Sequence, residues 1–234
     1  MNRGALAHFV NPGSEIDDGD FPNFRTEQGH ELKSSLNMRG EIMQTDLGAF
    51  NGGGPLDLSR GRAAQEHVVD VETTRIQDDG TIAVDDEGTE IATQDTDILH
   101  LEGEFIVTND TESDFAHNLI EDATGGTLVN SELDLGTFAE EYPQADIWLG
   151  GFYDRDGPVE KGVHIGDLSG DTDAREFIDE AAINRLGVEN FGYNGRSLKF
   201  LITESGYVDI YDSSVDTLEF VRFLHEIVVP HIAN

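Results

Sequence analysis

The polar residues between positions 154 and 173 form the best candidate for a reactive site in this chain. Asp154, Asp156 and His164 fall in this segment, and carboxylate oxygens beside an imidazole can hold a divalent cation that activates water. This grouping predicts a metal-dependent phosphoesterase or hydrolase. With 48 acidic residues among 234, however, acids at any fixed spacing are frequent by chance. The stretch 154–157 also lacks the glutamate of a calcium loop, so a turn is the simpler interpretation.

The sequence motifs of common catalytic sites are absent. His225-Glu226 begins like the zinc-protease motif HExxH, but Val229 stands where the second histidine is needed. There is no GxSxG nucleophile motif, no GxxxxGK[ST] phosphate loop and no GxGxxG turn. The chain has no cysteine, which excludes disulfides, zinc–thiolate sites and thiol nucleophiles. These absences favour a protein that is not an enzyme and requires no cofactor.

Arg60, Arg62 and Arg75 are a candidate basic patch for nucleic acid. A sheet face that carries arginine and aromatic side chains can stack bases and hold phosphates. Aromatic residues that alternate along a strand more often fill the core, and phosphate affinity needs clustered Lys and Arg. Because the net charge is −34, binding to nucleic acid would have to depend on this local patch, and it stays an alternative.

The charge of the chain is its most unusual property. Its 48 acidic residues outnumber 14 basic ones, which gives −34, whereas small soluble domains usually carry about 2 to 8 charges of either sign. Only three basic residues are lysines, and the acids are dispersed along the chain. This composition resembles that of proteins from salt-in halophiles, especially haloarchaea. The resemblance implies an acidic surface with bound K⁺ or Na⁺ ions, and a cation buffer or a protein that binds a basic partner is the alternative.

The hydropathy pattern gives no sign of a membrane segment or a secretion signal. No window approaches the roughly 18 uninterrupted apolar residues that a membrane span needs. The apolar stretch Ala5–Val10 is short, contains His8 and is followed by Pro12 rather than by a cleavage site. Together with the lack of cysteine, these features predict a soluble, cytoplasmic protein with no membrane partner.

Residues 1–66 and 67–234 differ in pattern, which predicts two parts. The first part is rich in Gly, Asn and Pro and has little periodicity, so we expect an irregular N-terminal extension. From residue 67 apolar and polar residues alternate, and the turn sequences DDGT and DDEGTE divide the stretch 67–108 into a meander of four antiparallel strands. The last of these strands, ILHLEGEFIVT, is expected to be long and continuous.

The second half alternates helices and strands. Helices are expected at about 113–123 and 171–186, because apolar residues recur at helical spacing between capping residues and glycines. ADIWLGGFYD with KGVHIGD predicts a hairpin, and SLKFLIT with YVDIYD predicts another before a helix at about 215–229, capped by Ser213 or Ser214. The chain is thus expected to have an α+β fold, mainly antiparallel sheet with about three packed helices.

The expected C-terminal helix is apolar nearly all round, which predicts a second contact surface. One stripe can pack on the sheet, while Phe220, Phe223 and Ile227 lie on adjacent faces and would form an interface with a second subunit. We therefore expect a non-catalytic protein that acts by association, as a homo-oligomer or as a component of an assembly with another protein.

Salt should stabilise this protein. A folded chain of this mass exposes roughly 10,000 Å², which places the 34 excess charges about 17 Å apart. Their repulsion is felt in dilute buffer, where the Debye length is about 8 Å, and is screened at 1 M salt, where it is about 3 Å. We predict that the melting temperature, measured by calorimetry, rises between about 0.1 and 2 M KCl. A melting temperature that does not change over this range would contradict the prediction.

Overall fold

The protein is built on one large antiparallel sheet. The computed structural model describes residues 1–11, 19–20, 24–25, 29, 31–38, 43–45, 56–109, 113–153, 162–168 and 182–233. Strands make up 58% of the structure and helices 19%. The expected α+β class is therefore wrong and the fold is predominantly β, because segments interpreted as loop or helix join the sheet as strands.

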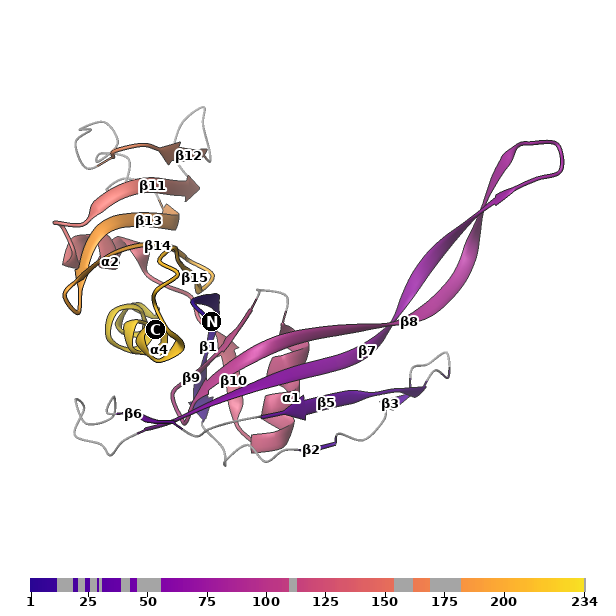
Figure 1. Ribbon diagram of the computed structural model, residues 1–234, viewed down its shortest axis with the longest axis horizontal. Helices are drawn as coiled ribbons and strands as arrows, with labels where there is room; N and C mark the ends of the chain where they lie inside the picture. The colour runs from indigo at the N-terminus through magenta and orange to yellow at the C-terminus, as the bar shows by residue number, and fades with distance from the viewer. Residues whose placement is uncertain are drawn as a thin grey trace.

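The elements are labelled in Figure 1. The strands are β1 (Arg3–Asn11), β2 (Gly19–Asp20), β3 (Phe24–Arg25), β4 (Glu31–Leu32), β5 (Ser34–Asn37), β6 (Met43–Thr45), β7 (Leu56–Ile76), β8 (Ile82–Leu101), β9 (Phe105–Thr108), β10 (Thr127–Asn130), β11 (Asp146–Tyr153), β12 (Gly162–Ile165), β13 (Ala182–Tyr193), β14 (Arg196–Thr203) and β15 (Tyr207–Ile210). The helices are α1 (Asp114–Thr124), α2 (Leu135–Glu141) and α4 (Thr217–Phe223), and α4 continues as a π-helical turn (Leu224–Val228) and a 3-10 turn (Val229–His231).

Strand β1 joins the two halves of the sheet. Among the described strands the order is β12-β11-β13-β14-β15-β1-β9-β8-β7-β5-β2, with β10 also on β1 and β6 also on β7. β1 pairs with β15 through Arg3–Ala5 and with β9 through Ala5–His8. It therefore lies in the middle of the sheet, although it belongs to the segment 1–66 that was expected to be an extension. The expected boundary at residue 66 falls inside β7.

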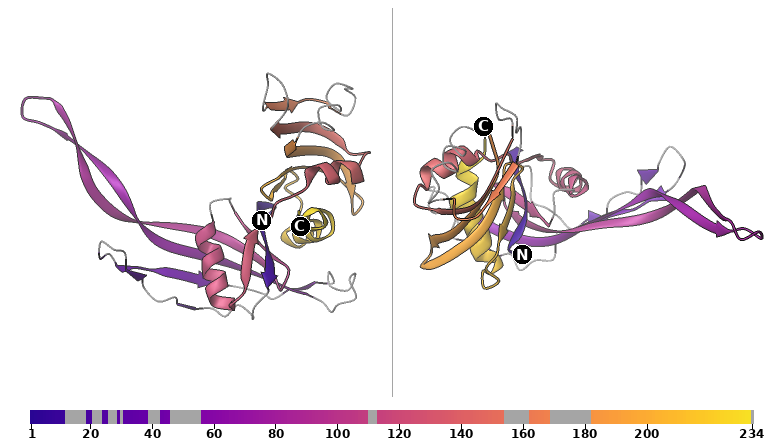
Figure 2. Two further views of the ribbon diagram at one scale, coloured as in Figure 1. Left: turned by 180° about the vertical axis from the view of Figure 1, so that it is seen from behind. Right: turned by 90° about the horizontal axis from the view of Figure 1, so that it is seen from above.

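Both faces of the sheet are covered near β1. Leu6 belongs to the larger core cluster and Ala7 to the smaller one, because neighbouring residues of a strand point to opposite faces. The C-terminal helix covers the first face and α1 covers the second (Figures 1 and 2). β9 is buried at all four of its positions for the same reason. A strand buried on both faces has a nearly continuous apolar sequence, as FIVT does here up to the buried Thr108.

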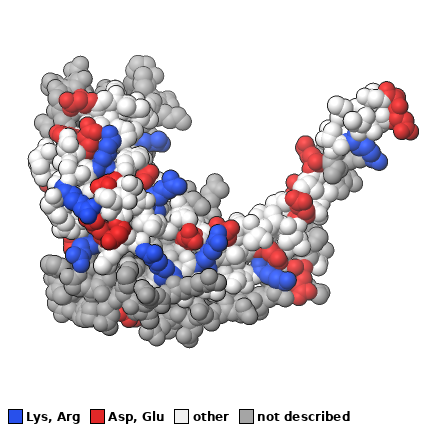
Figure 3. Space-filling view, viewed as in Figure 1, with Lys and Arg blue, Asp and Glu red and all other residues white. Residues whose placement is uncertain are grey.

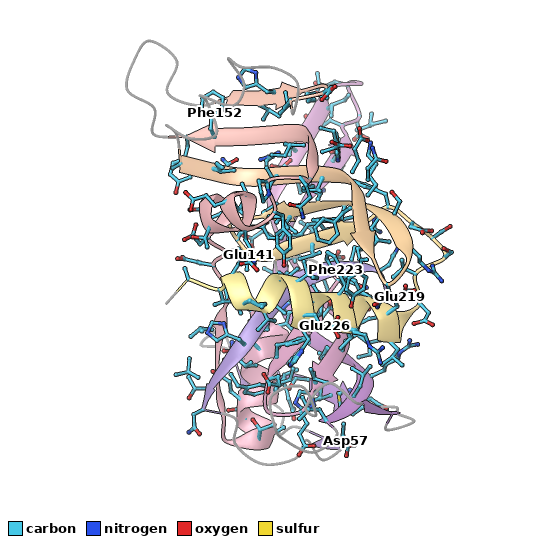
Figure 4. The ribbon with its side chains drawn as sticks, turned by 90° about the vertical axis from the view of Figure 1, so that its left-hand side faces the viewer. Asp57, Glu141, Phe152, Glu219, Phe223 and Glu226 are labelled. Carbon is cyan, nitrogen blue, oxygen red and sulfur yellow. The ribbon has the colours of Figure 1, made fainter. Side chains whose placement is uncertain are left out.

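The C-terminal helix packs into the larger core. Phe220 and Phe223 are each 0% exposed, and Ile227 is half-buried against the same cluster. The Phe223 ring lies on the side of the helix that faces the sheet (Figure 4), with its centroid 5.0 Å from that of Phe200 and 5.4 Å from that of Tyr193. Phe220 and Phe223 thus fill the core of a single chain, and the expectation that they form a surface for a second subunit is wrong.

The described helices are all short. α4 begins after Asp216, whose carboxylate accepts a hydrogen bond from the Glu219 amide at 2.9 Å, and not after Ser213 or Ser214 as expected. An Asp at this position satisfies a helix N–H group that would otherwise lack a partner. In the part of the chain that the structure describes, no helix has the length and apolar character needed to cross a membrane.

The expected meander has three strands rather than four. β7 and β8 pair along their common length, and the acidic stretch 85–90, expected to be a turn, lies within β8. A bulge after Val71 accommodates one extra residue of β8; the register shifts there by one residue and the pairing continues on both sides. The long strand expected at 98–108 turns at Gly103, whose φ of 71° favours glycine, so this segment supplies the end of β8 and all of β9.

Most elements expected in the second half are confirmed. α1 begins after Ser113 and ends at Gly125, β11 forms the expected hairpin with β12, and β14 forms another with β15. The helix expected at 171–186 is wrong at its C-terminal end, because residues from Ala182 onward form β13, and the rest of it lies outside the described residues. Leu186, expected on the inner face of that helix, is buried as a strand residue.

Replacing Phe223 by alanine should destabilise the folded monomer by about 3 to 5 kcal/mol, because the change leaves a cavity among aromatic rings of the same chain. Chemical denaturation at two protein concentrations measures the loss, which should be equal at both. A loss that grows on dilution would place Phe223 at a contact between copies and contradict the fold. The control Val163→Ala, at a side chain that is 49% exposed, should cost less than about 1 kcal/mol.

Candidate functional site

The described part of the expected metal site is a single residue. Asp154 and Asp156 lie outside the described residues, and His164 is on β12, where its ring lies 5.6 Å from that of Phe152 between centroids. Among the described residues, no group of three or more His, Asp or Glu side chains is arranged to hold a metal ion. The expected divalent-cation site therefore stays a prediction.

The three arginines of the expected nucleic-acid patch do not come together. Arg60 and Arg62 point to the same face of β7, whereas Arg75 is thirteen residues beyond Arg62, about 40 Å further along the extended strand. The Arg62 guanidinium donates to Asp95 from Nε at 2.8 Å, and its Nε also lies 3.8 Å from Asp97. Arg62 is thus largely neutralised by its own chain.

Arg60 and Arg62 line a cavity at the base of the β7–β8 hairpin. Its volume is about 340 Å³, and its described lining consists of Asn37, Arg60, Gly61, Arg62 and Asp97. No described carboxylate pairs with Arg60. Its positive charge, after the larger effect of burial, lowers the pKa of the Met1 amino group. Arg60 therefore adds a positive charge beside this cavity.

A second group of basic residues on β14 is also paired within the chain. Arg196 lies 3.3 Å from Glu219, and Lys199 donates a hydrogen bond to Glu189 at 2.8 Å. The Lys199 ammonium also lies 4.4 Å from the centre of the Trp148 ring, a cation–π contact. These contacts stabilise the sheet and leave little free positive charge for phosphate.

Among the described residues, the outer half of the β7–β8 hairpin differs from the rest of the sheet because no strand flanks it. β5 pairs with β7 as far as Gln65, and β9 pairs with β8 only from Ile98 onward. From His67 to Ala92 no described strand pairs with either side of the hairpin, and we call this segment the distal ribbon. It projects far beyond the sheet and helices of the body (Figures 1 and 2). At about 3.3 Å per residue its strands extend by roughly 30 Å.

The tip of the distal ribbon is a well-formed turn. The Gly80 amide donates to the Gln77 carbonyl at 2.8 Å, and the Gln77 amide donates to the Thr81 carbonyl at 2.8 Å. Thr81 also donates from its hydroxyl and its amide to Asp79, at 2.6 and 2.9 Å, and these bonds lower the pKa of the Asp79 carboxyl. Gly80 supplies the left-handed conformation, with φ of 83°. The turn therefore fixes the register of the ribbon.

One face of the distal ribbon carries its most exposed large apolar side chains. Residues directly opposite each other in a ladder share a face, as do residues two apart on one strand. The register pairs Val68 with Ile91, Thr74 with Val84, and Ile76 with Ile82. The exposed fractions are 74% for Ile76, 69% for Ile82, 52% for Val84 and 49% for Ile91. We call this side the apolar face; it is defined by Val68, Ile76, Ile82, Val84 and Ile91.

The distal ribbon is also strongly acidic. Between residues 67 and 92 there are eight Asp and Glu residues and one basic residue, Arg75, which gives a net charge of 1 − 8 = −7. Acidic side chains gather at the end of the projecting arm (Figure 3). The ribbon therefore combines an apolar face with a charge that repels nucleic acid and other copies of itself in dilute buffer.

A buried histidine lies in the body, at the base of the β7–β8 hairpin. His100 pairs with Ser59 across the ladder, is 6% exposed, and has its ring 5.6 Å from that of Phe9 between centroids. Its Nδ1 lies 3.4 Å from the Ser59 hydroxyl. Burial lowers the pKa of His100 to about 4, so the imidazole is neutral at physiological pH. It acts as a packing residue that holds the base of the hairpin.

Comparison with protein-family models and with curated protein sequences gives no match. The interpretation of the surface therefore depends on its geometry alone. The apolar face is not evident from the sequence, because the acidic stretch 85–90 has the composition of a turn and separates Ile82 from Ile91. The alternating apolar residues on both sides of the DDGT turn were the available signal.

Protonation of His100 should destabilise the protein in mild acid. The unfolded chain binds this proton near pH 6.5 and the folded chain only near pH 4, so stability is lost as the pH falls between these values. The full loss is on the order of 3 kcal/mol. Denaturation of wild type and His100→Phe between pH 7 and 4 isolates this contribution from the many carboxylates. Identical pH dependence of the two proteins would contradict the assignment.

Proposed function

We propose that this protein acts by association, as a homo-oligomer or as a component of an assembly, and that the distal ribbon is its contact element. One observation carries the proposal: four large apolar side chains, each about half exposed or more, lie on the same face of a ribbon that no described strand supports. Exposed apolar residues scattered singly are ordinary, whereas several on one projecting face are typical of an interaction site.

The energetics of a two-stranded ribbon favour a partner. An isolated hairpin is marginally stable in water and gains stability when a further strand or surface covers its apolar face. Burying one Ile or Val side chain contributes roughly 1.5 to 3 kcal/mol. Ile76 and Ile82 lie about 30 Å from the body, so the body of the same chain is too far away to cover them. We therefore expect a second molecule to bury the Ile76 and Ile82 side chains.

The charge supports a salt-rich setting for this association. A ribbon with a net charge of −7 repels other acidic surfaces in dilute buffer, and molar salt removes this repulsion while it strengthens apolar burial. We therefore place the contact in a salt-rich cytoplasm, in keeping with the composition of the whole chain. The alternatives have less support: the three arginines lie apart, and the projecting element repels phosphate.

Removing the apolar tip should abolish association. We expect wild type to form oligomers whose mass, measured by light scattering in about 2 M KCl, rises with protein concentration. In the double variant Ile76→Ser/Ile82→Ser the dissociation constant should rise by about 100-fold or more, because two buried side chains per copy are lost. Ile165→Ser is a matched control, since Ile165 on β12 is as exposed as Ile76, at 74%. A wild type that stays monomeric would contradict the homo-oligomer, and a control that loses association equally would contradict the role of the distal ribbon.

A further inference from the structure

We infer that the occupant of the apolar face is the distal ribbon of a second copy, packed face to face and antiparallel about a two-fold axis at Glu72. This inference rests on the proposed function and specifies its partner and its geometry. Face-to-face packing places two ribbons about 10 Å apart and aligned within about 30°. A two-fold axis is the commonest symmetry of soluble homo-oligomers and requires a surface that complements itself.

The apolar face has this self-complementary pattern. Glu72 is the middle residue of the face on β7, opposite the bulge of β8. An apolar pair lies at each end of the face, Ile76 with Ile82 toward the tip and Val68 with Ile91 toward the base. When two copies are placed antiparallel about Glu72, the Ile76–Ile82 pair of each copy packs on the Val68–Ile91 pair of the other. The apolar residues of both copies are then covered at the same time.

The pairs between the centre and the two ends also match. Thr74 with Val84 lies on one side of Glu72, and Asp70 with Thr89 lies on the other. In the antiparallel dimer the Thr74–Val84 pair of one copy faces the Asp70–Thr89 pair of the other. Each copy therefore contributes threonine side chains to the contact. The opposite face of the ribbon lacks this pattern, since Val69 pairs there with the exposed Glu90 and Val71 with Gly88.

The size of the contact makes it reversible. A face about 30 Å long and about 10 Å wide covers roughly 300 Å² per copy, or roughly 600 Å² in total. Contacts of this size belong to weak, transient associations rather than to permanent dimers. The fraction of dimer should therefore rise and fall with protein concentration. Burial of the apolar side chains should supply most of the binding free energy.

The centre of the contact makes it depend on salt. The two Glu72 carboxylates meet at the axis, and each Asp70 lies one pair away from it. Like charges at this distance oppose association in dilute buffer and are screened in molar salt, where cations also gather beside them. Glu72 thus links dimerisation to the salt concentration that the composition of the chain implies.

Cross-linking tests the geometry directly, because the chain has no cysteine of its own. In Glu72→Cys the two thiols meet at the axis, so a short bis-maleimide that spans about 10 Å should join two copies in about 2 M KCl. Glu90→Cys is the matched control, since Glu90 is an exposed acid of the same ribbon on the opposite face. Equal cross-linking of both variants, or cross-linking of Glu90→Cys alone, would overturn the inference.

Removing the Glu72 charge at the two-fold axis should strengthen the dimer. We expect Glu72→Gln to lower the dissociation constant about fivefold or more at about 0.15 M KCl and to change it little at 2 M, as measured by sedimentation at a series of concentrations. Glu90→Gln removes the same charge from the other face and should have a much smaller effect. Equal effects of the two variants would show that only net charge matters and would overturn the assigned axis.

The outcomes separate this inference from the proposed function. If wild type is monomeric at every salt concentration, this inference and the homo-oligomeric form of the proposed function both fail. If wild type associates and Ile76→Ser/Ile82→Ser does not, but Glu72→Cys fails to cross-link, the ribbon still binds a partner and the two-fold face-to-face geometry is wrong.

Discussion

The hydrogen-bonded ladder between β7 and β8 is the constraint on which the rest of the structure depends. Its inner half belongs to a sheet of many strands, where β5 and β9 flank it. Its outer half has the same backbone pairing and no described neighbour. Because β7 runs without a break from the body into the distal ribbon, the face that carries core residues such as Leu58 in the body becomes the apolar face of the distal ribbon. The same side-chain alternation therefore builds both the core and the exposed surface.

The body of the protein holds the base of this ladder rigidly. β1 contributes Leu6 to one core and Ala7 to the other, so the sheet is fixed from both sides where the two halves meet. The C-terminal helix, with Phe220 and Phe223 fully buried, closes the larger core within one chain. This arrangement buries Phe220 and Phe223, whereas Ile76 and Ile82 of the distal ribbon stay exposed.

Local patterns in the sequence predicted the elements whose contacts are local. The helix after Ser113, the β11–β12 hairpin and the β14–β15 hairpin each have a cap or a turn next to an alternating run. The place of β1 at the centre of the sheet depends on pairing with residues 105–108 and 207–209, which no local pattern encodes.

The exposed apolar surface was missed for two physical reasons, although the alternating residues beside the DDGT turn pointed to it. An apolar helix such as 217–228 fits a core or an interface equally well until its neighbours are known. The acidic stretch 85–90 has the composition of a turn, yet cross-strand pairing and a bulge keep it in β8. The apolar face depends on that continuity, because only an unbroken β8 brings Ile82 and Ile91 onto one side of a ribbon.

Hydrogen–deuterium exchange as a function of protein concentration tests the central claim, that a second molecule covers the distal ribbon. In about 2 M KCl, peptides from residues 67–92 should exchange more slowly as the concentration rises, while peptides from the core strand β9 should not change. Exchange in the distal ribbon that is independent of concentration, in a sample that light scattering shows to be associated, would contradict the account.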